Sequence, residues 1–160
     1  MCIKENAVSP QVLIIVNPGK EARIARDVLD ALYTYDERLC VKSAKGLLAV
    51  FSRLEADEVI NLLKKYPIRG VLSVNRIDGY APISGSIEDA LTSILEELAE
   101  KMGGRINIEI RSRGYFKTEK LRSIIENIAN RIGLKKRGGQ TVRIELTDKF
   151  VYYYFRRRAH

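Results

Sequence analysis

Hydrophobic and polar positions in the first half of the chain alternate between short apolar runs and amphipathic stripes. The run QVLIIV at 11–16 is rich in β-branched residues and predicts a buried strand. Over 21–33, apolar residues recur at helical spacing and predict an amphipathic helix. The patterns that follow predict strands at 38–42 and 46–53, a helix at 55–65 and a strand at 69–77. This β-α-β-β-α-β order predicts a ferredoxin-like half, with both helices on one face of a four-stranded sheet.

A different order follows in the second half. Residues 78–85, DGYAPISG, are rich in Gly, Pro and Ser and predict a linker. Ser86 then has the character of a helix N-cap. The later patterns predict a helix from Ile87 to Met102, a strand at 105–111, a helix at 117–132, a loop at 134–140 and strands at 141–146 and 150–156. We therefore expect an α/β (α+β) chain with a flexible tail at 1–9, a ferredoxin-like domain at 10–80 and an αβαββ domain at 81–160.

Composition and charge indicate what kind of partner the chain binds. The chain has 160 residues, of which 46% are hydrophobic and 30% charged, which is enough for one ordinary domain or two small ones. No run approaches the roughly 20 apolar residues of a membrane span, and MCIKENAVSP lacks a signal-peptide core, so we expect a cytoplasmic protein with no membrane partner. The formal net charge of +8 favours a polyanionic partner.

The positive charge is concentrated in the last third of the chain. Residues 105–160 hold fifteen Lys and Arg against five Asp and Glu. At the joint IEIRSRGYFKTEK, Arg111 and Arg113 end a predicted strand, and Lys117 and Lys120 begin a predicted helix. Cations oppose the dipole at a helix N-terminus, which prefers an anion, so the joint predicts an anion-binding site. The alternative is a solvated basic edge that discourages sheet-to-sheet aggregation.

Two further segments have residues that suit nucleic-acid binding, and each also has a purely structural explanation. LKKRGGQ places Lys135, Lys136 and Arg137 on a Gly-rich loop whose backbone can approach a phosphate, or which is simply solvated. In FVYYYFRRR, one aromatic face belongs to the core. The other is either a platform for base stacking or a packed face, and we favour packing. The run Arg156–Arg158 either binds phosphate or forms a tail.

Catalytic and metal-binding patterns are weak. NPGKEAR lacks the spacing of a phosphate-binding Walker loop. The single histidine is the terminal His160, which argues against Ser-His and Cys-His catalysis. The two cysteines, Cys2 and Cys40, have no metal-ligand spacing, and we expect two unpaired thiols. The sequence thus predicts a protein that is not an enzyme and has no cofactor, metal or catalytic residue.

Several segments together resemble the THUMP domain and the ferredoxin-like domain that usually precedes it. INIEIRSRG, KTEKLRSIIENIANRIG and the pair VRIEL and FVYYYFR are similar to the THUMP part. VNPGKEARIARDVLDAL and KKYPIRGVLSVNRI resemble the start and end of the ferredoxin-like part. The resemblance runs from about residue 10 to 157. It departs from the family at LKKRGGQ, where Val-Asp-Leu and Asn-Pro-Asp are often found.

The resemblance implies an RNA-binding module of tRNA-modifying systems, with contacts near the acceptor stem and 3′ end of tRNA. Most members carry a catalytic domain after the module, whereas this sequence resembles the stand-alone adaptor of the acetyltransferase that makes 4-acetylcytidine. We therefore expect a tRNA-binding adaptor that presents tRNA to such an enzyme. The predicted phosphate contacts are Arg111, Arg113, Lys117, Lys120, Lys135, Lys136 and Arg137. The alternatives are a subunit of a tRNA methylation or thiolation system, a purely structural enzyme subunit, and a small-molecule regulatory module of ferredoxin-like type.

Overall fold

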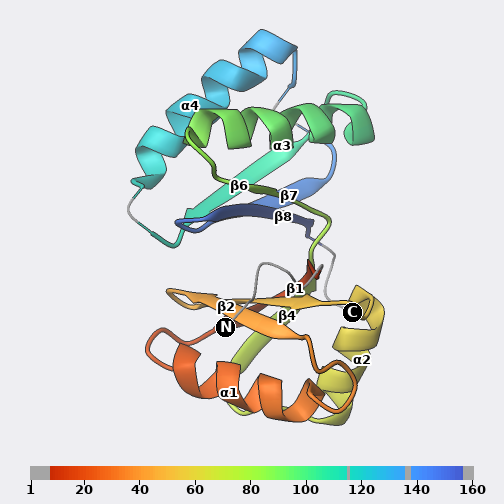
Figure 1. Ribbon diagram of the computed structural model, residues 1–160. Coiled ribbons are helices and arrows are strands. Elements are labelled where there is room, and N and C mark those ends of the chain that lie inside the picture. Colours follow the sequence, from red (N-terminus) through yellow and green to blue (C-terminus); the bar gives the residue numbers. More distant parts are fainter. Residues whose placement is uncertain (1–7, 115, 136–137, 157–160) are drawn as a thin grey trace. The chain divides into compact units, whose positions relative to one another are not determined.

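The computed structural model describes residues 8–114, 116–135 and 138–156, which form two compact units divided between Ile77 and Asp78 (Figure 1). The first unit contains β1 (Ser9–Val16), α1 (Glu21–Leu32), β2 (Cys40–Ala44), β3 (Leu47–Ser52), α2 (Ala56–Lys65) and β4 (Val71–Arg76). The second contains β5 (Gly79–Pro82), α3 (Ile87–Met102), β6 (Asn107–Ser112), α4 (Thr118–Ile132), β7 (Thr141–Leu146) and β8 (Phe150–Phe155). The mixed α/β class predicted from the sequence is confirmed.

The first unit has the predicted ferredoxin-like topology. Its antiparallel sheet has the order β2-β3-β1-β4, and both helices cover one face (Figure 1). The helical stripe Ile24, Val28 and Val59 packs against Val12 and Ile14 of the central strand, and all five are fully buried. The apolar periodicity of the sequence therefore corresponds directly to the core of this unit.

The turn NPGKE between β1 and α1 is held by its own carboxylate. Glu21 accepts hydrogen bonds from the backbone N–H groups of Gly19 at 2.7 Å and Gly46 at 2.8 Å. Backbone hydrogen bonds to its carboxylate, first from Gly46 and then from Glu21 itself and Gly19, lower the pKa of Glu21 below its ordinary value. The Lys20 N–H group donates to the Asn17 carbonyl at 3.2 Å, so the backbone donors of Gly19 and Lys20 are both used within this part of the unit.

One expectation for the first unit is wrong. Cys40 is buried in β2 and is disulfide-bonded, which contradicts the expectation of two unpaired thiols. Cys2 lies outside the described residues. The sequence could not predict this bond, because disulfide formation depends on the distance and orientation of two Cα–Cβ vectors in the folded chain.

The second unit has a mixed sheet in the order β5-β8-β7-β6, with β6 and β7 parallel and the other neighbours antiparallel. Its first strand corrects the linker prediction for 78–85, since Gly79–Pro82 pairs with β8. A side chain at Gly79 would overlap the buried ring of Tyr153, so the glycine permits close strand approach. Pro82 is compatible with the strand because it lies at the end of an edge strand.

Both helices of the second unit cover one face of its sheet (Figure 1). Leu91 and Leu95 of α3, Leu121 of α4, and Val142 and Ile144 of β7 are fully buried in the resulting core. Within the described residues, no helix is long and apolar enough to cross a membrane.

The aromatic strand β8 is packed on both faces. Tyr152, Tyr153 and Tyr154 are all buried, and Tyr153 belongs to the core beneath the helices. The Tyr153 hydroxyl donates to Glu97 at 3.0 Å and accepts from Lys101 at 2.7 Å. The preference for packing over an exposed stacking platform is therefore confirmed.

Candidate nucleic-acid interface

The basic joint of the sequence lies between the edge strand β6 and the first turn of α4. Ile108 and Ile110 of β6 pack against the core beneath the helices, and alternation places Glu109 and Arg111 on the opposite face. Arg111 is exposed near the end of the strand. The strand thus fastens the joint to the core while presenting a cation to solvent.

The start of α4 continues this positive surface. Lys117 is the N-cap residue, with extended backbone angles (φ −76°, ψ 136°), and no side chain in the described part of the chain caps the helix there. Lys117 and Lys120 are exposed, and Glu119 is the acidic residue of the first turn. Because the backbone N–H groups at a helix N-terminus carry partial positive charge, these lysines strengthen a local preference for anions.

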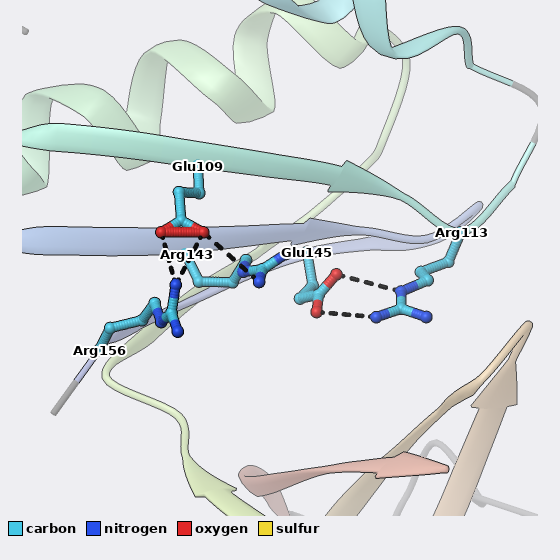
Figure 2. Close-up of polar contacts among 5 residues, drawn as sticks. All are labelled: Glu109, Arg113, Arg143, Glu145 and Arg156. Atoms are coloured by element: carbon cyan, nitrogen blue, oxygen red, sulfur yellow. Dashed lines mark hydrogen bonds and ion pairs between the residues drawn. The ribbon is translucent and has the colours of Figure 1, made fainter. Parts of the chain in front are cut away.

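Arg113 belongs to the same joint but has a structural role in place of the predicted phosphate contact. Its Nε and Nη2 atoms donate to the two carboxylate oxygens of Glu145 on β7, each at 3.1 Å (Figure 2). The side chains are 9% and 1% exposed, respectively. The Arg113 backbone N–H also donates to the Leu146 carbonyl at 2.7 Å. Arg113 therefore anchors the joint to β7, and its guanidinium is occupied.

The remaining predicted residues lie near the other end of β6. Lys135 is exposed, and its backbone forms a parallel bridge with Arg105. From residue 105 to Arg111 an extended chain covers roughly 20 Å, so Lys135 and Arg111 do not form one cluster. Lys136 and Arg137 lie outside the described residues, and their predicted contacts stay predictions.

A second arginine–glutamate group lies on the same sheet, and the sequence pattern did not reveal it. Glu109 of β6 accepts hydrogen bonds from Nη1 of Arg156 at 2.8 and 3.1 Å and forms an ion pair with Nη2 of Arg143 at 3.4 Å (Figure 2). Glu109 and Arg143 are register partners in the parallel β6–β7 pair. Alternation places both residues on one face, but only the register brings them together.

The electrostatics of this face follow from the two groups. The hydrogen bond to Glu109 raises the pKa of Arg156 above its ordinary value, so Arg156 carries its positive charge at every pH at which the protein is folded. Burial, and then the negative charge of Glu145, raises the pKa of Tyr154, which is therefore neutral near pH 7. Arginine is thus the source of positive charge on this face, and it carries that charge permanently.

An open groove of about 600 Å³ follows β6. It is lined by Asn107, Ile108, Glu109, Ile110, Arg122, Ile125, Glu126 and Arg143. Apolar and charged side chains alternate along it, because it takes residues from both faces of the edge strand. In the described part of the chain, no three His, Cys, Asp or Glu side chains are grouped so as to hold a metal ion. The groove is therefore a surface on which a ligand could bind, and its positive charge comes from Arg122 and Arg143.

Fold and surface together define a two-unit α+β protein with a basic edge on its second unit. The chain is similar to PH1313 from Pyrococcus horikoshii OT3, with a TM-score of 0.57 and 14% identity over 92% of this chain. It is also similar to TrmN from Thermus thermophilus, with a TM-score of 0.52 and 18% identity over 91% of this chain. It spans 54% and 45% of their lengths, respectively.

These likenesses show the fold alone, and they confirm the predicted α+β arrangement. The sequence matches no protein-family model and no curated protein.

Proposed function

We propose that the protein binds tRNA through the exposed cations beside β6 and α4, namely Arg111, Lys117, Lys120 and Lys135. The observation that carries this proposal is the start of α4, where lysines stand in place of a capping side chain. The arrangement adds side-chain charge to the positive end of a helix, which suits a phosphate group. Such contacts fix the position of an RNA through its backbone and read little sequence.

The choice of tRNA rests on the resemblance of the second unit to the THUMP domain, which also suggests contacts at the acceptor stem and 3′ end. On the same basis, we propose that the chain acts as a non-catalytic adaptor that presents tRNA to an acetyltransferase forming 4-acetylcytidine. Adding the chain to that enzyme should increase cytidine acetylation of tRNA. Equal acetylation with and without the chain would exclude this role and leave methylation or thiolation partners to be tested.

The binding surface is tested by charge reversal. The variant Arg111→Glu/Lys117→Glu should lose at least about tenfold in tRNA affinity, because two charge-assisted contacts become repulsive. The matched control is Arg26→Glu/Lys64→Glu, which changes the net charge equally at exposed positions of α1 and α2. Gel-shift titrations with tRNA and with duplex DNA provide the measurement. Unchanged tRNA affinity in the first variant contradicts the site assignment, and equal affinity for both nucleic acids reduces the claim to general polyanion binding.

A further inference from the structure

Glu109 lies between two arginines that come from different parts of the sheet. Arg143 belongs to β7, and Arg156 directly follows β8. Both carboxylate oxygens of Glu109 accept from Arg156, and one of them also pairs with Arg143 (Figure 2). One carboxylate thus holds two guanidinium groups on the sheet face opposite the helices.

This group differs from the Arg113–Glu145 pair in its exposure. Glu109 is 38% exposed, Arg143 21% and Arg156 54%. Breaking a buried pair leaves an uncompensated charge, whereas water can solvate the partners of an exposed pair. The Glu109 group can therefore open to an incoming anion, which the Arg113–Glu145 pair cannot do at comparable cost.

The chemistry of the two arginines suits a phosphate group. Guanidinium presents a planar fork of donors that matches carboxylate and phosphate oxygens alike. Glu109 and Arg143 both line the open groove along β6, so a ligand can reach them. The Nε atom of Arg143 is buried and has no hydrogen-bond partner among the described residues.

We propose that Arg143 and Arg156 form a binding site for a phosphodiester group of RNA, and that Glu109 occupies this site in the free protein. This inference rests on the proposed RNA-binding function and deepens it. A phosphodiester presents two non-bridging oxygens and one negative charge, so it can replace the Glu109 carboxylate. An RNA must displace Glu109 from the arginines before it can bind them. A ligand that makes no other contact with the protein should therefore bind weakly.

The test compares Glu109→Gln with Glu100→Gln. Glu100 is exposed on α3, which packs on the other face of the sheet, and its replacement changes the net charge equally. In filter-binding titrations at low salt, Glu109→Gln should bind tRNA about threefold to tenfold more tightly than the control, since the Glu109 carboxylate no longer competes for the two arginines. Adding Arg156→Gln should remove that gain. Affinity in Glu109→Gln no higher than in Glu100→Gln would overturn the inference and leave Glu109 as a structural cross-strand link.

A second measurement uses the unaltered protein and does not depend on how the variant folds. The Nε–H resonances of Arg143 and Arg156 should shift when tRNA is added, while unmoved resonances with tRNA bound would contradict the site. If the unaltered protein binds no tRNA, the proposed function itself fails. That outcome is distinct from a protein that binds tRNA but gains nothing from Glu109→Gln.

Discussion

The two helices of the second unit begin with different residues at the N-cap position. At the start of α3, Ser86 Oγ accepts from the backbone N–H groups of Glu88 at 3.1 Å and Asp89 at 3.3 Å, and both acids favour the helix dipole. At the start of α4, Lys117 occupies the N-cap position, where no described side chain makes a capping hydrogen bond, and Lys120 shares the first turn with the single acid Glu119. Both helices pack on the same face of one sheet. The residues at the start of α3 therefore stabilise that helix. The lysines at the start of α4 do not stabilise theirs, because their positive charge opposes the helix dipole.

The two starts also differ in what fixes them. Ser86 caps α3 within three residues of its own position. The joint that leads into α4 is instead held by Arg113, which reaches Glu145 thirty-two residues away and the Leu146 carbonyl. Because these contacts of Arg113 fix the joint, the N-cap residue of α4 does not have to stabilise it. The exposed lysines of α4 are therefore available for binding, because Arg113 holds the joint in their place.

The largest expected effect comes from breaking this anchor. Arg113→Ala should lower the free energy of unfolding by about 3 kcal/mol, because it leaves Glu145 buried without its charge partner. Arg111→Ala, at an exposed position of the same joint, is the control and should change it by less than about 0.5 kcal/mol. Urea unfolding measures both. Equal small losses would show that the anchor does not hold the joint.

Substitutions at the two N-cap positions should change the free energy of unfolding by smaller amounts and in opposite directions. Ser86→Ala removes a cap and should cost about 1 kcal/mol. Lys117→Ser supplies a capping hydroxyl and removes an unfavourable charge, so it should gain roughly 0.5–1 kcal/mol while weakening tRNA binding. Thermal unfolding and tRNA titration of both variants provide the measurement. A loss of stability in Lys117→Ser would mean that the lysine stabilises α4, and the contrast between the helices would disappear.

Much of the fold could be predicted because it follows from local periodicity. The apolar stripe of α1 and the β-branched run of β1 specify their elements and their buried faces. β5 could not be recognised in this way. Its four residues include Gly79 and Pro82, which are typical of a linker, and its strand character depends on pairing with β8 near the Tyr153 ring.

The site was only partly predictable for the same physical reason. Strand alternation and helix polarity indicated that Arg111, Lys117 and Lys120 lie at an exposed joint, and the structure places them there. The partners of Arg113 and Arg143 depend on the register between β6 and β7. No local pattern in the sequence determines that register, so the paired arginines could not be separated from the exposed cations.

If the exposed cations beside β6 and α4 bind RNA phosphates, tRNA affinity must fall with salt concentration in proportion to the number of phosphates contacted. If about five phosphates are neutralised, the log–log slope should be about −3.5 to −4.5 for the unaltered protein. Replacing Arg111, Lys117, Lys120 and Lys135 by Gln should reduce its magnitude by about three. The control replaces four exposed cations of the first unit, Arg26, Arg38, Lys64 and Lys65. The control should keep the slope of the unaltered protein, whereas a slope reduced equally in both variants, or in neither, would show that these four cations are not the phosphate contacts.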